Sequence, residues 1–584
     1  MPLAMHGATP LIVGVTSHRN LVAGEIDGLR HAVAGLFREL RQRFPDLPLL
    51  VLSALAEGGD RLVAEEALAC GARLMAVLPL PPEQYAEDFV EPGSREAFAR
   101  LRASGETVQI PLLPHNTFHG VSSAGSQRDA QYAEAGVFIA SHCHILLAVW
   151  DGRESDLTGG TAQIVRYHLE GVMPGSIDRR SSSRPLFDRG DESLVCHVAC
   201  SRQNTDGTIA APQAPLQAGE TQWLCQDNGR TRHASLPPEF EEMFRHMTGF
   251  NLDMDRYREE IAGQVPRQEN LPGSHESGPG QGIGTTSMLF HASDWLAIHF
   301  QRRVLLAMRG IHVLAVLMGF AFIAYSDMPG DLFDIAPMIY AFILFFASGF
   351  VLDRLAKRRA WHRKYIDYRA LAEGLRVQRY WLMAGVASDQ SVAFAHDNFM
   401  QKQDVELGWI RNVMRVAGLE RHQGKHPSAT EVDAVIDDWI GHPNGGGQLG
   451  YYARKGAERT RIAAAASRIG NICLWIGLGI GLVLAVFHRW LNPDLATILV
   501  AVIGLLALIA AARESYTYRK ADRELIKQYR FMHQLFASAR RALDAETTAR
   551  GKREILRALG EASLAEHAEW ALMHRERPLE HGRL

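Results

Sequence analysis

The sequence predicts a protein of two parts: an N-terminal α/β domain with a doubly wound parallel sheet, and an all-α membrane region with four transmembrane helices in two hairpins. The first part is indicated by short apolar runs that alternate with amphipathic helical stretches between residues 10 and 172. The second is indicated by four apolar runs of 16–18 residues after residue 300. Strands that alternate with helices form parallel sheets, and a bilayer is crossed by roughly 17–25 apolar residues.

Length and composition limit the classes of protein that fit the chain. It has 584 residues, a formal net charge of -3 and a pI of about 6.8, so no basic field favours a nucleic acid as partner. Hydrophobic residues make up 47% and charged residues 22%, which excludes a disordered or fibrous chain. Six cysteines without regular spacing argue against a secreted disulfide scaffold. Met1–Pro10 lacks the pattern of a signal peptide, so none is expected.

The N-terminal part alternates strands and helices. The predicted strands are Leu11–Val15, Leu49–Ser53, Arg73–Leu78 and Ile145–Trp150, with Ser193–Cys200 as a final strand. The first predicted helix places Ile26, Leu29, Val33, Leu36, Phe37 and Leu40 on one face. Further helices are expected to end at Ala69, Cys143 and Glu170. This order predicts a Rossmann-like sheet.

Polar or glycine-rich segments follow three of these strands. Because ligands bind beyond the carboxyl ends of the strands in such sheets, these segments predict a ligand-binding site. Its residues are Thr16, His18, Arg19, Glu57, Gly58, Gly59, Asp60, Arg61, Asp151, Gly159, Gly160 and Thr161.

The residue types of this set suit a nucleotide. The backbone N–H groups of Gly159, Gly160 and Thr161, at the positive end of a helix dipole, suit a phosphate, and Arg19 adds a bidentate contact. Glu57 and Asp60 would accept hydrogen bonds from ribose hydroxyls or base donors. A nucleotide-derived ligand is therefore expected, with a simple turn as the alternative interpretation of the glycines.

Four apolar runs are the predicted membrane spans: Gly310–Tyr325, Ile335–Leu352, Ile472–Phe487 and Leu495–Ala512. The alternative is four buried core helices of a soluble protein, which fits less well because charged residues bracket paired runs. The loops inside the pairs, 326–334 and 488–494, are mainly acidic, whereas the outer ends are rich in Arg and Lys. By the positive-inside bias, the hairpins of an inner (plasma) membrane protein would point outward from cytoplasmic soluble parts.

The two hairpins repeat at a constant spacing. Ile311 and Ile472, Ile335 and Ala496, and Tyr368 and Tyr529 are each 161 residues apart. This spacing predicts a duplicated unit of cytosolic helix, membrane hairpin and cytosolic helix. The span centres hold no acidic residue, which argues against an ion-coupled transporter.

The third span contains Gly477, Gly479 and Gly481. Small residues let helices approach closely in lipid, so these glycines predict either self-assembly or close packing within one hairpin.

Four segments together resemble the SLOG superfamily: GVTSHR, SALAEGGDRLVAEEAL, LMAVLPLPPEQYAEDF, and LLAVWDG followed by GGTA. That superfamily includes LOG-type nucleotide phosphoribohydrolases, DNA-processing Smf proteins and the cytosolic sensor region of TRPM channels. The membrane part is similar to the SLATT family of two-span effectors, through ASDWLAIHFQ, WHRKYIDYRALAEGLRVQRYW and DDWIGHPNGGGQLGYYARKGAERTR. The resemblance implies a nucleotide-derived signal sensed in the cytosol and a membrane-perforating response in bacterial conflict or stress.

One departure bears on catalysis. LOG-type hydrolases carry PGGxGTxxE, whose Glu and a separate Arg support N-glycosidic cleavage. This chain has no proline there, and Ile164 stands where the acid would fall. Hydrolysis by that route is not expected, although Glu57 or Asp60 as acid or base leaves a membrane-tethered nucleotide-cleaving enzyme as the alternative.

Two clusters contain metal-binding residue types, His142-Cys143-His144 and Cys196-His197 with Cys200. Neither has the spacing of four zinc ligands, so no metal site and no cofactor are expected.

The predicted domains are a ligand-binding domain at 1–205, a connecting region at 206–286 and two similar membrane units at 287–430 and 431–584. Gly175–Leu186 and Val265–Thr286 are the expected linker and mobile loop. The expected function is a sensor whose ligand gates or assembles a transmembrane pore. A homo-oligomer is expected because four short spans are too few to line a pore.

Overall fold

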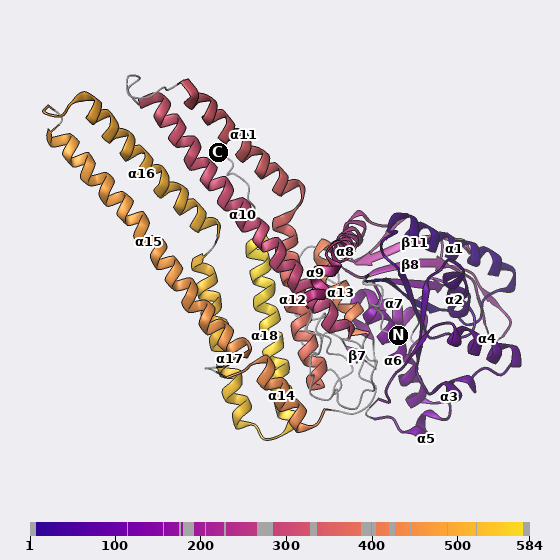
Figure 1. Cartoon of the computed structure of the whole chain (residues 1–584). Helices are drawn as coiled ribbons and strands as arrows, with labels where there is room; N and C mark the ends of the chain where they lie inside the picture. The colour runs from indigo at the N-terminus through magenta and orange to yellow at the C-terminus, as the bar shows by residue number, and fades with distance from the viewer. Residues whose placement is uncertain are drawn as a thin grey trace. The chain divides into compact units, whose positions relative to one another are not determined.

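The computed structural model describes residues 8–113, 115–155, 157–173, 177–178, 192–204, 206–226, 229–264, 284–327, 336–386, 399, 405–419, 427–442, 445–487, 489–520 and 522–575. The chain forms two compact units that interleave along the sequence (Figure 1). Unit 1 contains Met1–Ala292 and Leu371–His426, and unit 2 contains Ser293–Ala370 and Pro427–Leu584. The expected linker and mobile loop, and most of the loop 326–334, lie outside the described residues.

Unit 1 is built on an eight-stranded, mostly parallel sheet in the order β12-β11-β8-β5-β1-β2-β3-β4. Its strands are β1 (Leu11–Ser17), β2 (Leu49–Ser53), β3 (Arg73–Leu78), β4 (Glu106–Gln109), β5 (Ile145–Trp150), β8 (Leu194–Ala199), β11 (Thr221–Gln226) and β12 (Arg230–His233). The six strands from β8 to β4 are parallel, and β11 and β12 are antiparallel additions at one edge. The strands predicted from the sequence are confirmed, except that β8 is not the last.

Helices cover both faces of this sheet. On one face, α6 (Ser126–His142) and α7 (Thr161–Glu170) bury their apolar side chains with Ile12, Leu146 and Val195. On the other face, α2 (Gly59–Ala69) starts against Ser17. α1 (Ile26–Arg43) packs on α2 and buries Leu29, Val33, Leu36, Phe37 and Leu40, as its periodicity predicts.

The smaller elements are η1 (Ala23–Glu25), α3 (Pro82–Ala86), α4 (Pro92–Ala103), α5 (Phe118–Val121), α9 (Arg258–Gln264), η6 (Val405–Leu407) and the two-residue strands β6 (Val172–Met173), β7 (Ile177–Asp178), β9 (Arg202–Gln203) and β10 (Ile209–Ala210).

Two helices from later in the chain complete unit 1. α8 (Pro238–Arg256) reaches the start of β1, where Asn251 accepts a hydrogen bond from the Thr9 N–H at 2.8 Å. α13 (Gly408–Gly418) is buried from Gly408 to Ala417 and lies at the residues that precede β5 and β8. The predicted boundaries at 205, 286 and 430 therefore do not coincide with the compact units, and the predicted connecting region supplies β11, β12 and α8.

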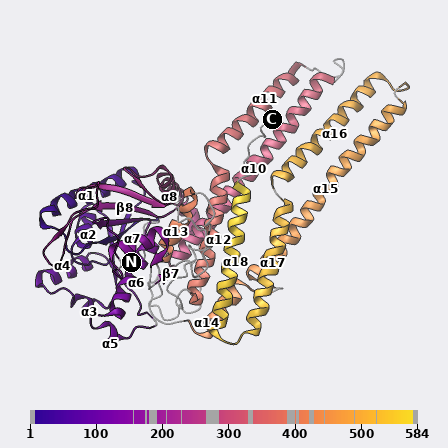
Figure 2. The same ribbon diagram turned by 180° about the vertical axis from the view of Figure 1, so that it is seen from behind.

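Unit 2 is helical (Figures 1 and 2). Its helices are α10 (Thr285–Asp327) and α12 (Trp361–Ala384), which unit 1 shares, with α11 (Ala336–Arg358), α14 (Ala429–Trp439), α15 (Gly447–Phe487), α16 (Pro493–Arg519), α17 (Asp522–Ala545) and α18 (Ala549–Arg575). The helix bounds recur at the spacing found in the sequence. α12 and α17 begin 161 residues apart and end 161 residues apart, as do the ends of α11 and α16.

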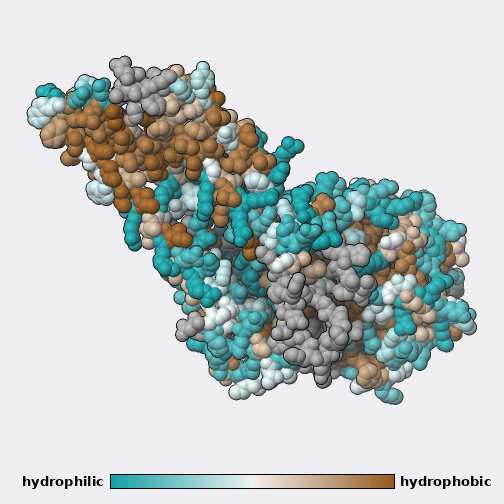
Figure 3. All heavy atoms as spheres, viewed as in Figure 1, coloured by the Kyte–Doolittle hydropathy of each residue, from teal (hydrophilic) through white to brown (hydrophobic). Residues whose placement is uncertain are grey.

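Within the part of the chain that the structure describes, four helical stretches are long and apolar enough to cross a membrane: Thr285–Ser326, Ala336–Ala384, Gly447–Phe487 and Pro493–Ala545. Each contains one predicted span. In three of them only 6% of the most apolar window is buried within the chain, and in the first 22%. Figure 3 shows apolar side chains gathered on the surface of this helical part. Buried core helices would not leave this surface uncovered, so the four helices indicate a multi-pass membrane protein.

Glycines mark a close contact between two of the apolar helices. A Cβ added to Gly319 of α10 would lie 2.3 Å from Leu508 Cδ2 of α16, and one on Gly504 would lie 3.3 Å from Ile323. By contrast, a Cβ on Gly477, Gly479 or Gly481 of α15 would meet no described atom within 4 Å. Within the described chain, the three glycines of α15 therefore do not serve close packing inside one hairpin. Their role in self-assembly stays a prediction.

Candidate functional site

The candidate site lies where the strand order of the sheet reverses. β1 has β2, β3 and β4 on one side and β5 and β8 on the other. The chain leaves the carboxyl ends of β1 and β5 toward opposite faces, and in sheets with such a reversal this is the place where ligands bind, here named the crevice. Eleven of the twelve residues of the predicted site follow β1, β2 and β5, and Thr16 lies within β1, so the topology brings these three segments to one edge of the sheet.

The end of β1 is tied to the end of β5 by a contact between His18 and Asp151. His18 Nε2 lies 3.2 Å from Asp151 Oδ1, and the two side chains are 13% and 5% exposed. Burial acts to raise the pKa of Asp151, but the hydrogen bonds from His18 and the Arg153 N–H outweigh it and leave this pKa below its ordinary value. The carboxylate of Asp151 thus stays ionised at neutral pH.

The end of β1 is also tied to the start of α2. Ser17 Oγ donates to Asp60 Oδ1 at 2.6 Å, and Asp60 is 4% exposed. Burial raises the pKa of Asp60 to about 6, against the opposing effects of the Ser17 and Ala56 hydrogen bonds and of Arg19 and Arg61. A carboxyl group in this state exchanges its proton near neutral pH.

Gly58 and Gly59 allow these segments to meet. Gly58 has a φ of 82°, and a Cβ there would lie 2.1 Å from the Arg19 carbonyl oxygen. The Gly59 N–H donates to the His18 carbonyl at 3.1 Å, and a Cβ on Gly59 would lie 2.5 Å from Ser17 Cβ. Both glycines therefore hold α2 against β1, which is a positioning role, and the ligand contact expected from the sequence stays a prediction.

Arg61 connects the segment after β2 with α4. Its Nε donates to the Leu55 carbonyl at 3.0 Å and its Nη1 to Ser94 Oγ at 2.7 Å, while Ser94 donates to Glu57. Its Nη2 is buried and has no hydrogen-bond partner among the described residues. Burial lowers the pKa of Arg61, an effect that the nearby Glu57 opposes. Glu57 is thus already engaged, and the N–H groups of Arg61 Nη2 have no hydrogen-bond acceptor among the described residues, although the guanidinium lies 4.3 Å from the ring centroid of Phe89.

An aromatic wall completes the site and was not predicted from the sequence. Tyr85 is 1% exposed, and its hydroxyl has no hydrogen-bond partner among the described residues. Burial raises its pKa, with Arg19 opposing this and Asp60 adding to it, which places these charges around the phenol. Tyr132 of α6 contacts Tyr85 with ring centroids 5.7 Å apart and donates to Asp88, and the Arg19 guanidinium lies 5.8 Å from its ring centroid.

The sequence held a signal for this wall. Tyr85 and Asp88 both lie in the segment LMAVLPLPPEQYAEDF, which contains most of β3 and the residues that follow it. Tyr132 and Ser94 carry no such signal, because only the packing of α6 and α4 brings them to the sheet edge.

The Gly159–Thr161 segment differs from the expected phosphate cradle. The Gly159 N–H donates to Gln163 Oε1 at 3.2 Å and the Gly160 N–H to the Leu157 carbonyl at 2.9 Å. These two N–H groups are therefore engaged in the loop itself. What remains for an anion is the first turn of α7 from Thr161 onward, whose N–H groups have no intrahelical acceptors. Gly159 itself lies against Ala133, the neighbour of Tyr132, with φ of 73°.

The described residues contain no group of three or more His, Cys, Asp or Glu side chains that would hold a metal ion. The two cysteine–histidine clusters have other roles. His144 Nε2–H donates to the Asn412 carbonyl at 3.0 Å, and burial raises the pKa of the Cys196 thiol.

No family of known proteins, no curated protein and no solved structure matches this chain. Function is therefore argued from the site itself.

Proposed function

We propose that the chain is a membrane-anchored sensor whose nucleotide-derived ligand binds the crevice at the ends of β1, β2 and β5 and gates or assembles a transmembrane pore. The observation that carries the proposal is the unfilled hydrogen-bonding capacity of buried groups there. Tyr85 Oη and Arg61 Nη2 lack partners among the described residues, beside an Asp60 whose pKa is near neutral. Folded proteins seldom leave such groups unsatisfied, and a ligand with several donors and acceptors would fill them.

The chemistry of the crevice fits the parts of a nucleotide. Asp60 accepts and Tyr85 and Arg61 donate, which suits ribose hydroxyls and base edges. The ring of Tyr132 offers a stacking surface beside the exposed guanidinium of Arg19, and Arg19 with the first turn of α7 suits a phosphate.

The membrane half of the proposal rests on the four apolar helices and on chain connectivity. We infer that they pair as two hairpins in the inner membrane, with both soluble parts in the cytoplasm and with several subunits needed to line a pore. Residues 293–370, which hold α11, are inserted between two stretches of unit 1. Any ligand-dependent change in the separation of residues 292 and 371 must therefore be taken up by that insert. Gating also requires that the ligand bind one state more tightly than the other.

A second candidate, a membrane-tethered nucleotide-cleaving enzyme, is favoured by Asp60. Its pKa of about 6 lies in the range that suits a general acid or base at neutral pH. In this alternative the apolar helices are only an anchor.

Both candidates are tested with the full-length chain in dye-loaded liposomes and, separately, in detergent. A panel of mononucleotides, dinucleotides, cyclic nucleotides and ADP-ribose is screened for a rise in unfolding temperature, and each mixture is then analysed by chromatography. A ligand at 100 times its Kd stabilises by about 2.7 kcal/mol, which is readily detected. The sensor is expected to be stabilised by a ligand that is recovered intact and that releases dye.

A pair of tyrosine variants links any response to the crevice. Tyr85→Phe removes a hydroxyl that contributes no hydrogen bond in the described structure, so it should spare the fold and weaken binding about 10-fold. Tyr167→Phe makes the same change at a tyrosine between α6 and α7 and should bind normally. Saturating ligand with impermeable liposomes would refute the pore, and recovery of cleaved product would establish the enzyme instead.

A further inference from the structure

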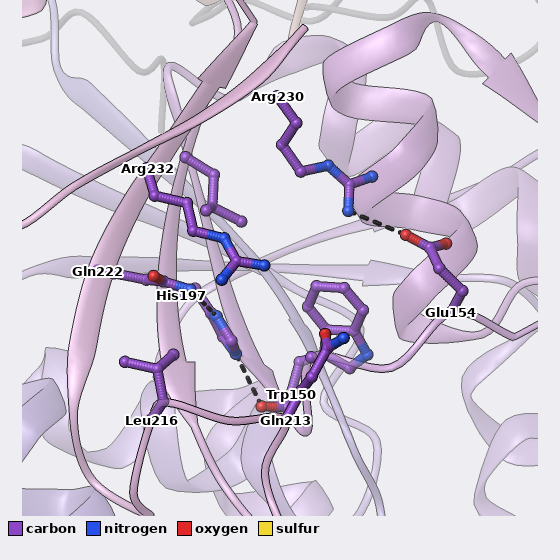
Figure 4. Close-up of a pocket in the computed structure, with 10 residues that line it drawn as sticks. Trp150, Glu154, His197, Gln213, Leu216, Gln222, Arg230 and Arg232 are labelled. Atoms are coloured by element: carbon purple, nitrogen blue, oxygen red, sulfur yellow. Dashed lines mark hydrogen bonds and ion pairs between the residues drawn. The ribbon is translucent and has the colours of Figure 1, made fainter.

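A separate cavity of about 190 Å³ lies on the other side of β5 from the crevice (Figure 4). Its walls come from the end of β5, from β8, β11 and β12, and from the segment around Gln213. The residues that the argument uses are Trp150, His197, Gln213, Gln222, Arg230 and Arg232. Most of this cavity is contributed by residues after 205, beyond the predicted ligand-binding domain.

The floor of the cavity is fixed by a neutral histidine. His197 Nε2 lies 2.9 Å from the Trp150 carbonyl, which can only accept, so Nε2 carries the proton and Nδ1 accepts from Gln222 at 3.0 Å. Burial lowers the pKa of His197, and the carbonyl hydrogen bond opposes this only in part. Both ring nitrogens are engaged, so His197 holds Gln222 and the strand end in place and adds no charge.

The charge of the cavity comes from two arginines on one strand. Arg230 and Arg232 are two residues apart on β12 and so project to the same face. Arg230 is held by Glu154 at 2.9 Å and by Glu170 at 3.4 Å. Arg232 forms no ion pair within the described part of the chain, and Figure 4 shows its guanidinium pointing into the cavity between His197 and Trp150. Among the lining residues, two guanidinium groups face a single carboxylate, Glu154.

We propose that this cavity binds the phosphoryl group of a small molecule, at a site distinct from the crevice. A guanidinium presents a planar fork of N–H donors that matches phosphate oxygens, and the side-chain amide of Gln213 adds donors from the facing wall. A phosphoryl group has enough oxygens to accept from Arg232 and from Gln213 at once. The excess positive charge excludes a cation, and the polar lining excludes an apolar ligand.

The site stands independently of the proposed sensor function, yet one loop joins it to the crevice. Gly152 lines the cavity, while the preceding Asp151 pairs with His18. The Gln213 N–H donates to the Asp151 carbonyl at 2.7 Å, so a wall of the cavity holds the same residue in place. An anion bound here would therefore act on the loop whose Asp151 contacts His18 and so ties β1 to β5.

Inorganic pyrophosphate is the probe for this site, titrated calorimetrically into the full-length chain in detergent at constant ionic strength. Arg232→Gln is expected to weaken binding about 10-fold or more, because it removes a charge-assisted hydrogen-bond donor from an exposed side chain that forms no ion pair with any described residue. Arg38→Gln is the matched control, since Arg38 is an exposed arginine on α1. It should bind pyrophosphate as the unmodified chain does.

Arg19→Gln separates this site from the crevice. Binding that is lost with Arg232→Gln and kept with Arg19→Gln supports the cavity. Binding that is lost with Arg19→Gln and kept with Arg232→Gln places the probe in the crevice, which overturns this inference and leaves the sensor proposal standing. Absence of binding to the unmodified chain at millimolar pyrophosphate overturns it as well.

Discussion

The carboxyl group of Asp60 lowers the stability of the fold at neutral pH. Its pKa rises from an ordinary 3.8 to about 6 because it is buried. Between these two values the folded chain holds more protons than the unfolded chain, so this group's contribution to stability falls as pH rises through that range. Above pH 6 the ionised, buried carboxylate lowers the free energy of unfolding by its full amount, on the order of 3 kcal/mol. A residue that destabilises the fold at the mouth of a crevice is typical of a binding or catalytic role.

Replacing Asp60 with Asn should therefore stabilise the protein in a pH-dependent way. The unfolding temperature should rise at pH 8, where an ionised carboxylate is removed, and the gain should shrink toward zero near pH 4. Thermal unfolding of the full-length chain across this range measures the difference. Asp46→Asn, at an exposed carboxylate, should show no comparable gain at pH 8. An equal gain at pH 4 and pH 8 would contradict the assigned burial cost.

How far the sequence could predict the site depends on where each residue comes from. His18, Asp60, Arg61 and Asp151 directly follow strands or open a helix after one, so alternation of strands and helices is enough to bring them together. Tyr85, Ser94 and Tyr132 lie in α3, α4 and α6. Tyr85 lies in the segment that follows β3, whereas the approach of Ser94 and Tyr132 to the sheet edge is a consequence of tertiary packing, which has no local pattern in the sequence.

Among the elements, α10 and α16 are held together by a glycine that leaves no room for a side chain. Gly319→Val should lower the unfolding temperature in detergent by several degrees, because its Cβ would overlap Leu508 and overpacking costs about 1–3 kcal/mol. Gly479→Val is the matched control. It makes the same change at a position of α15 where a Cβ would have no described atom within 4 Å. The two variants therefore differ in packing and not in the helix propensity of the new residue. Equal effects of the two variants would show that α10 and α16 do not pack in this way.

Strands and helices differ in how clearly the sequence marks them. β1, β2, β3 and β5 are buried on both faces and are therefore continuous apolar runs. β4 and β12 lie at the two edges of the sheet, contain mostly polar residues and are partly exposed, so hydropathy does not mark them. The four apolar helices are marked by length and composition alone.

At the scale of the whole molecule, unit 1 depends on a segment that follows the first two apolar helices. α13 lies against the residues just before β5 and β8, at the end of these strands opposite the candidate site. Arg411 donates to the buried Glu192 at 2.7 Å, just before β8. His144, just before β5, accepts from the Ile12 N–H at 3.1 Å and donates to the Asn412 carbonyl at 3.0 Å. Burial lowers the pKa of His144 to about 3, so this connection requires a neutral imidazole.

A fragment of residues 8–264 should therefore be much less stable than the same fragment joined through a flexible linker to residues 405–419. Without α13, the apolar surface that it covers would be exposed to water, the ion pair of Arg411 with Glu192 would be lost, and the His144 Nε2–H would lose its acceptor. Urea unfolding of the two fragments measures this difference. A third fragment, with Arg411→Met in the joined segment, should fall between them, because α13 still covers the apolar surface but leaves Glu192 without its partner. Equal midpoints for the first two fragments would show that unit 1 folds without the later segment, and the two soluble stretches would then be separate domains rather than one unit interrupted by α11.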